Sequence, residues 1–387
     1  MYELLPDKID KLRATAAETT ARHIAPLSDQ VDAQGTWPTH SMRALADAGL
    51  LGLHAPVKVG GQGEGLLALA VVSETIAQGC ASSAMCYAMH CVGTAVIAAK
   101  ATPYHEDRYL RPIAQGRHIT TLALSEAGTG AHFYLPQTPL ERVGDQFAIT
   151  GEKHFITNGG HADSYVISTQ ASVAAEEGEF SCLIIDADAP GIEWRGPWCG
   201  FGMRGNSSRG ARFTNVLVSQ RNLLGAEGDQ IWYVFEVVAP YFLIGMAGTY
   251  LGVAQAAVDE TVKRLRERRH DHSERALADV QVLQHKVAAM WIALERTRAL
   301  VYRAARLGDC GDPRATQAIM AAKADAAEMS VWVANEAMTC CGGIAYRDNS
   351  TLARLLRDAR ASHVMSPTTE LLKLWIGRGL LGLPYLA

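Results

Sequence analysis

The sequence predicts an α+β fold in which helices come first, strands follow and helices return. Apolar residues recur at spacings of three and four within 42–53 and 67–76, which is typical of amphipathic helices. Between about Ile119 and Leu224, short β-rich runs are bounded by glycine, aspartate, asparagine and proline, which indicates an antiparallel barrel or sandwich. The helical period returns after Asp229 and continues to the end. We therefore expect three domains: an N-terminal all-α domain (1–117), a central β domain (118–228) and a C-terminal helical-bundle domain (229–387).

The composition favours a globular protein with a large core and no nucleic-acid or membrane partner. The chain has 387 residues, of which 48% are apolar and 20% charged. Its net charge of −4 provides no positive field for a phosphate backbone. The longest apolar runs, such as 66–72, fall short of the ~18 residues that a membrane helix needs, and the polar N-terminus does not resemble a signal peptide. We expect a cytoplasmic protein with reduced cysteines and no metal site.

Three motifs follow one another along the chain. They are Leu122 to Gly130 (LALSEAGTG), Gly151 to Gly160 (GEKHFITNGG) and Gly202 to Gly205 (GMRG). In this order the chain resembles the acyl-CoA dehydrogenases, and the resemblance extends over nearly its whole length. It implies an acyl-CoA dehydrogenase-like α+β fold with an N-terminal helical domain, a central antiparallel β-barrel domain and a C-terminal four-helix bundle. It also implies FAD as cofactor, a role in fatty acid metabolism, and assembly as a homodimer or homotetramer.

The residue types in these motifs suit a flavin. A flavin is a flat apolar ring with polar edges, so its site needs an aromatic face, hydroxyl or backbone donors, and glycine near the pyrophosphate. Phe155 is the expected aromatic face, with Ser125 and Thr157 as donors. The resemblance assigns cofactor contacts to Leu124, Ser125, Gly130, Ala131, Phe155, Ile156, Thr157 and Thr368. Alternatively, 155–157 is an ordinary strand that precedes a turn.

The C-terminal half resembles the second FAD surface of the family, which neighbouring subunits usually supply to one another. The residues concerned are Arg268, Gln281, Thr339, Gly342 and Gly343. Two details depart from the family pattern, because Asp271-His272 replaces the usual Phe-Gly and Ala345 replaces a glycine. The alternative for the charged stretch 263–275 is a solvated helix end with ion pairs.

The carboxylate that starts the family's reaction is absent from both of its usual positions. In that reaction a glutamate removes the α-proton of an acyl thioester while the flavin accepts a hydride from the β-carbon. Counting from 356–360 (LRDAR), the commoner position is occupied by Ser366, and the alternative position by Phe242. The family's contacts to the distal part of the thioester are replaced by Pro240 and Leu243. Both changes weaken an assignment to CoA substrates.

Other residues are candidates for the missing function. Glu370 and His363 lie close to Ser366 in sequence, and His90 comes from the first domain, although a core or flavin-edge position is the simpler interpretation of His90. Ser366 at the family position also fits a helix start, with serine as N-cap, Pro367 as the first helical residue and Glu370 in the first turn. A neutral serine is too weak a base to replace glutamate without an activating partner, although its backbone N–H can polarise a carbonyl.

Three functions therefore remain open from the sequence. The first is FAD-dependent α,β-desaturation of an acyl thioester, carried by CoA or a carrier protein, with an electron acceptor such as an electron-transfer flavoprotein. The second is a flavin-dependent monooxygenase of the same fold, in which histidines would steer the reaction with oxygen. The third is a non-oxidative lyase or a flavin-binding protein. The lost base motivates the last two.

Overall fold

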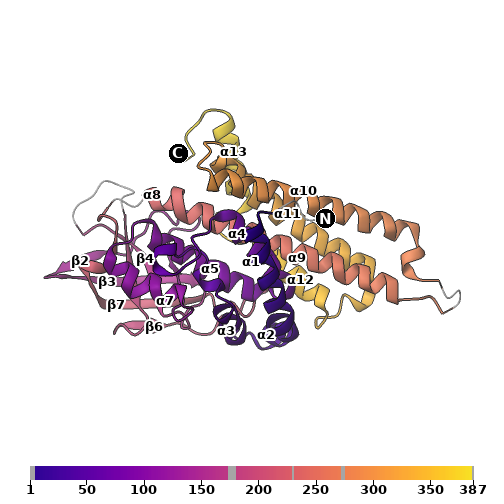
Figure 1. The fold of residues 1–387 in the computed structure, drawn as a ribbon, viewed down its shortest axis with the longest axis horizontal. Helices are drawn as coiled ribbons and strands as arrows, with labels where there is room; N and C mark the ends of the chain where they lie inside the picture. Colours follow the sequence, from indigo (N-terminus) through magenta and orange to yellow (C-terminus); the bar gives the residue numbers. More distant parts are fainter. Residues whose placement is uncertain (1–4, 173–179, 229–230, 272–274, 386–387) are drawn as a thin grey trace.

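A computed structural model describes residues 5–172, 180–228, 231–271 and 275–385. Figure 1 shows the strands at one end of an elongated molecule, the N-terminal helices in the middle and the long C-terminal helices extending away from the strands. The order of helices, strands and helices is confirmed. Helices stop at Ala114, strands run from Thr120 to Leu224, and helices resume at Ile231. The domain boundaries at 117/118 and 228/229 remain a prediction.

The N-terminal helices surround two that are apolar on all sides. Nearly every residue of α4 and α5 is buried, and a helix that is apolar all round belongs in a core. The helices of this part are α1 (Asp7–Thr19), α2 (Ser28–Gln34), α3 (Thr39–Asp47), α4 (Leu66–Gly79), α5 (Ala81–Ala99), α6 (Pro103–His105) and α7 (Arg111–Ala114).

Two four-stranded sheets form the central part and enclose their own apolar core. The first sheet has the order β1-β4-β5-β8 and the second β2-β3-β7-β6. The predicted antiparallel pairing holds for every pair but one, because β1 runs parallel to β4. The strands are β1 (Thr120–Ala123), β2 (Leu140–Val143), β3 (Gln146–Ile156), β4 (Ser164–Gln170), β5 (Phe180–Asp186), β6 (Ile192–Trp194), β7 (Arg209–Ser219) and β8 (Leu223–Leu224).

The C-terminal part is a bundle of long helices, as expected. Helix α11 packs against α9, α10, α12 and α13, and α9 also packs against α4, so the first and last parts share one hydrophobic core. The helices are α8 (Ile231–Tyr233), α9 (Ala239–Glu267), α10 (Gln281–Asp309), α11 (Ala315–Cys341), α12 (Thr351–Val364) and α13 (Thr369–Leu380).

Two helical stretches are long and apolar enough to cross a membrane by composition, although the sequence runs alone indicated none. They are Ala81–Ala99 and Val234–Glu267, and 94% and 78% of their most apolar windows are buried inside the protein. Packing against neighbouring helices therefore accounts for their apolar character.

Helix α12 joins all three parts of the chain. The Arg357 guanidinium donates to Asp32 Oδ1 at 2.9 Å in the N-terminal part and to the carbonyl of Phe201 at 3.2 Å in the central part. The buried Asp358 accepts a hydrogen bond of 2.6 Å from the Met203 amide. These contacts fix the loop of the central part against the bundle, where the main cavity lies.

Candidate active site

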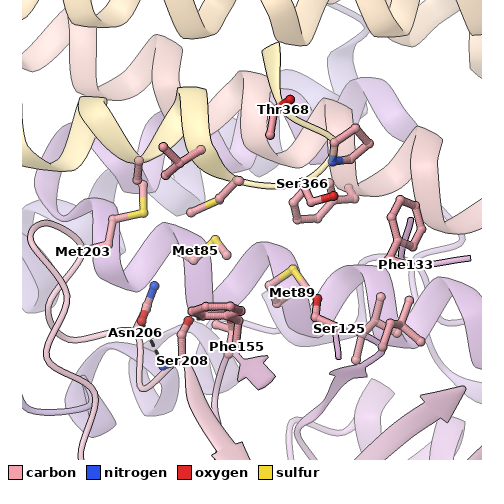
Figure 2. Close-up of a pocket in the computed structure, with 18 of the residues that line it drawn as sticks. Met85, Met89, Ser125, Phe133, Phe155, Met203, Asn206, Ser208, Ser366 and Thr368 are labelled. Carbon is pink, nitrogen blue, oxygen red and sulfur yellow. Dashed lines mark hydrogen bonds between the residues drawn. The ribbon is translucent and has the colours of Figure 1, made fainter. Parts of the chain in front are cut away.

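A cavity of about 710 Å³ lies where the three parts meet, a volume typical of a site for a cofactor and a small substrate. Figure 2 shows Ser366 and Thr368 on one side of it, and Phe155, Ser125, Asn206 and Ser208 on the other. Helix α5 contributes Met85 and Met89 to the wall between them. Most of the remaining lining is apolar: Leu122, Leu124, Ala127, Gly130, Ala131, Phe133, Trp198, Phe201, Gly202, Met203, Val238, Ala239, Phe242, Ala361, Val364, Met365 and Pro367.

Phe155 presents a large aromatic surface at the end of β3. Its side chain is 66% exposed although it borders the cavity, and it meets Trp198 edge to face with ring centroids 6.3 Å apart. Its φ is 54°, which is unfavourable for a bulky residue and costs of order 1–3 kcal/mol. An exposed aromatic ring held in a strained backbone differs from the ordinary strand that the alternative interpretation assumed.

Asn158 holds the turn that follows. Its side chain accepts a hydrogen bond of 2.9 Å from the Trp37 indole and donates one of 2.9 Å to the carbonyl of Cys86 on α5. Its own φ is 61°, a left-handed conformation that asparagine tolerates better than most residues. The 155–160 motif is thereby anchored to the N-terminal helices.

The motif glutamate, Glu126, has a structural role. It is buried, and its Oε1 lies 2.6 Å from the Nζ of Lys153. It also accepts hydrogen bonds from the Gln137 and Thr138 amides at 2.7 and 3.2 Å. Burial by itself would raise the pKa of Glu126, but the Lys153 ammonium and the hydrogen bonds outweigh burial and lower it. Both groups are therefore charged near neutral pH, and the pair closes the loop that follows β1.

The hydroxyls and glycine predicted to contact FAD do lie at the cavity. Ser125 and Thr157 line it, and Thr157 Oγ1 lies 3.1 Å from the Ser208 hydroxyl. Gly130 has a φ of 53° and open space where a Cβ would stand. Leu124, Ala131 and Thr368 line the cavity too, whereas Ile156 is buried in the core of the strands. An aromatic face with hydroxyls and a glycine beside it fits the ring and edges of a flavin.

Ser366 borders the cavity, but it does not cap a helix. Its Oγ donates a hydrogen bond of 3.2 Å to the carbonyl of Ala131. The N-cap of α13 is Thr368, whose Oγ1 accepts from the Leu371 amide at 3.3 Å, so the predicted capping role of Ser366-Pro367 is wrong. Sequence reasoning missed this because threonine, at Thr368 two residues later, is also a favoured cap residue. Glu370 does lie in the first turn, as predicted.

The three alternative bases point elsewhere. None of Glu370, His363 and His90 is among the cavity-lining residues. The side chain of Glu370 is 84% exposed, so it faces solvent. His90 is fully buried, with Nε2 2.9 Å from the Leu51 carbonyl and Nδ1 accepting from the Thr120 amide at 3.2 Å. Burial lowers the pKa of His90 to about 4, so it is a neutral core residue, as the simpler interpretation held.

Within the part of the chain that the structure describes, the cavity wall contains one carboxylate, Glu126, and no histidine. Phe242, at the second position where the family carries a base, also lines the cavity. Pro240 and Leu243 line a small apolar cavity beside it, together with Phe133. The positions expected for a base are thus at the cavity and are not acidic.

The second predicted cofactor surface lies away from the cavity. Arg268, Gln281, Thr339, Gly342 and Gly343 are all exposed, and none lines the cavity. Arg268 directly follows α9, Gln281 begins α10, Thr339 lies in the last turn of α11, and Gly342 and Gly343 follow that helix. Their contribution to a neighbouring subunit's site stays a prediction, and His272 lies outside the described residues.

Other cavity residues escaped sequence reasoning. They include Met85, Met89, Trp198, Asn206, Ser208, Val238, Ala239, Arg357 and Arg360. The glycine-rich motif at 202–205 pointed to the segment that carries Asn206 and Ser208. Nothing in the sequence distinguished Met85 and Met89 from core residues of α5.

Comparisons with known proteins cover most of the chain. Three domain families match in order: acyl-CoA dehydrogenase, N-terminal domain, at 6–117; middle domain, at 121–216; and C-terminal domain, at 241–381. Cyclohex-1-ene-1-carbonyl-CoA dehydrogenase of Geobacter metallireducens is 29% identical over 94% of this chain and 95% of its own length. The mitochondrial 2-methylacyl-CoA dehydrogenase of Solanum tuberosum is 28% identical over 97% of this chain and 91% of its own length. The structure of butyryl-CoA dehydrogenase from Megasphaera elsdenii superposes with a TM-score of 0.92 at 25% identity, covering 98% of this chain and 100% of that one.

Proposed function

Because this chain belongs to the acyl-CoA dehydrogenase family, an FAD-dependent family of oxidoreductases acting on CH–CH bonds, we propose that it desaturates the α,β bond of an acyl thioester. The observation that carries the proposal is the cavity itself, in which an exposed aromatic face and hydroxyls lie opposite a mainly apolar wall.

Bound FAD supplies a two-electron acceptor for the hydride of the β-carbon. The residues that would hold it are Phe155 against the ring, Ser125 and Thr157 at its polar edges, and Gly130 where the backbone must come close. Across the cavity, Met85, Met89 and Phe242 would exclude water from the acyl group. Exclusion of water strengthens every polar contact that remains inside the site.

Among the described cavity residues, neither Glu126 nor Ser366 is available to accept the proton of the α-carbon. Glu126 is the one carboxylate among the described cavity residues, and Lys153 and three further donors occupy its oxygens. The Ser366 hydroxyl points its proton at the Ala131 carbonyl and is neutral near pH 7. We infer that the α-proton passes to a basic group of the substrate itself, and that the substrate has an unusually acidic α-carbon.

A restored base tests this proposal. In Ser366→Glu, a carboxylate would stand at the cavity wall, and general-base catalysis contributes about 10²–10⁴-fold. We expect anaerobic bleaching of the flavin by butyryl-CoA to accelerate by roughly that range relative to the natural protein. A matched control, Phe242→Leu, adds no base and should not accelerate it. Absence of any flavin reduction in Ser366→Glu, with FAD bound and the fold intact, would count against desaturation of thioesters.

Among the described cavity residues no carboxylate is free to act as a base, because Glu126 is paired with Lys153, and this favours a second candidate, a flavin-dependent monooxygenase. That candidate has less support, because no histidine lines the cavity within the described residues. Product formation that requires both oxygen and a separate reductase would identify it. Turnover under anaerobic conditions with an artificial acceptor would exclude it.

The partners and the assembly follow from the same proposal. We propose an electron-transfer flavoprotein as electron acceptor and a homodimer or homotetramer as the assembly. Large apolar side chains are exposed on the long helices, namely Trp291, Ile292 and Trp332, at 49%, 58% and 42%. Light scattering of the FAD-loaded protein would show a monomer if the proposed assembly is wrong. A cytoplasmic location is proposed because all eight cysteines carry free thiols.

A further inference from the structure

A buried lysine lies behind the cavity-lining segment 365–368. Lys323, on α11, has an exposed fraction of 0%. Its Nζ lies 2.9 Å from the carbonyl oxygen of Ser362, 3.4 Å from that of Met365 and 2.9 Å from that of Pro367. An ammonium group has three donors and no acceptor, so these three carbonyls use all of them. Among the described residues, no carboxylate forms an ion pair with it.

The simplest explanation of Lys323 is that it caps the C-terminus of helix α12, but this explains one of the three contacts. Helix α12 ends at Val364, so the carbonyl of Ser362 belongs to its last turn. Carbonyls of the last turn have no hydrogen-bond donor within the helix. A cation at the C-terminus of a helix satisfies such a carbonyl and is favoured by the helix dipole. The carbonyls of Met365 and Pro367 lie beyond the helix, on either side of Ser366. A capping role does not account for them.

The contacts fix which way two peptide groups face. In a trans peptide the C=O and the following N–H point in opposite directions. With the carbonyls of Met365 and Pro367 directed at Lys323, the N–H groups of Ser366 and Thr368 point away from it. Both residues line the cavity, and neither amide donates a hydrogen bond to another residue in the described parts of the chain. Two backbone donors therefore stand at the cavity wall, available to a ligand.

We propose that Lys323 is a positioning residue, which holds the 365–368 segment so that the Ser366 and Thr368 amides are presented to an acceptor atom of the bound ligand. Lys323 itself is buried and is not among the residues that line the cavity. Its charge at the carbonyl end of each peptide also polarises the N–H at the other end, which strengthens both donors. The inference rests on the proposed function only in naming the acceptor, which would be the carbonyl oxygen of a thioester.

Hydrogen exchange of the FAD-loaded protein tests the positioning without any substrate. Lys323→Met removes the ammonium and keeps an apolar stem of similar length. The amides to follow are Met365, bonded to the carbonyl of Ala361 at 3.1 Å, and Leu371 and Leu372 in the first turn of α13. We expect their exchange to become at least about ten-fold faster, because the segment loses its three anchors, with the β strands unchanged.

Two matched variants complete that experiment. Lys373→Met removes an exposed lysine of α13, which pairs with Glu328 and Glu370, and should leave these amides at their natural rates. Lys323→Arg keeps the charge and the donors and should restore slow exchange at least in part. If Lys323→Met exchanges at the natural rate, the lysine acts only through packing of its stem and the proposal is wrong.

A second readout connects the positioning to catalysis. With butyryl-CoA as probe and Ser366→Glu as the parent protein, adding Lys323→Met should reduce the rate of flavin bleaching by about ten-fold. The apparent Kd should change by less than about three-fold, because donors that meet developing charge act on the rate step. Equal rates together with faster exchange would remove the catalytic part of the proposal. If butyryl-CoA fails to reduce Ser366→Glu, the desaturation proposal fails, and the exchange result still decides the role of Lys323.

Discussion

The two walls of the cavity each rest on a buried lysine, and the two lysines are satisfied in different ways. One wall, which carries Ser125, Phe155 and Ser208, comes from the central strands and their loops, and behind it Lys153 pairs with Glu126 at 2.6 Å. The other wall, the helical wall, carries Ser366 and Thr368, and behind it Lys323 contacts backbone carbonyls alone. Burial lowers the pKa of both lysines to about 8, although Glu126 opposes that shift for Lys153. One wall is thus held by a pair of opposite charges, and the other by a single positive charge that contacts only carbonyl groups.

The largest expected effect comes from breaking the pair. Glu126→Gln leaves the Lys153 ammonium buried without a counter-charge, and loss of one partner of a buried pair costs about 3–5 kcal/mol. We expect the free energy of unfolding in urea to fall by about that amount at pH 7. A loss below about 1 kcal/mol would mean that solvent or another group neutralises Lys153, and the contrast between the walls would disappear.

The unpaired lysine should appear in the pH dependence of stability. The pKa of Lys323 is about 8 in the folded protein and 10.5 in its unperturbed state, so the unfolded chain binds more protons between these values. The free energy of unfolding of the natural protein, minus that of Lys323→Met, should therefore rise by about 1.4 kcal/mol per pH unit above pH 8. Nearby His363 has a lowered pKa and does not titrate in this window. A flat difference from pH 7 to about 9.5 would contradict the unpaired charge.

Asp358, a buried acid on α12, should show the opposite pH dependence from Lys323, because its stability contribution falls as the pH rises. Burial raises the pKa of Asp358 to about 6 from 3.8, and its contact at 2.6 Å is the neutral Met203 amide. Because its pKa is raised in the folded state, Asp358 contributes stability that is fully present below pH 3.8 and is lost as the pH rises through about 6. Asp358→Asn should abolish this loss and be more stable by up to about 2–3 kcal/mol at pH 7.5, with little difference near pH 4. Thermal unfolding at both pH values, with the salt concentration held constant, measures it.

The smallest effect is expected at the junction of the two walls. Ser366→Ala removes one hydrogen bond, of 3.2 Å, from the half-buried hydroxyl to the carbonyl of Ala131. The net value of such a bond is about 0.5–1.5 kcal/mol, so we expect a shift near the lower limit and unchanged FAD content. Loss of FAD from Ser366→Ala would mean that the Ser366 hydroxyl contacts the cofactor, and the expectation of a purely structural hydrogen bond would be wrong.

Much of the fold could be predicted because it depends on local periodicity. The spacing of apolar residues located the helices, and the turn residues between short β-rich runs located the strands. The parallel pairing of β1 with β4 could not be predicted, because strand partners far apart in sequence are chosen by packing. The same limit applies to α5, whose composition predicts burial but not the contribution of Met85 and Met89 to a cavity.

The sequence by itself determined the family, the cofactor and the residue types at the two positions where a base would stand, since each depends on the order of residues in a motif. Only the tertiary structure decided that Ser366 faces the cavity without capping a helix, that Glu126 is committed to Lys153, and that His90 is a core residue. The role of Lys323 also appeared only in the fold, because its three partners are backbone carbonyls about 40 residues away. Backbone groups are the same at every position, so a contact to them leaves no trace in the sequence of the partner.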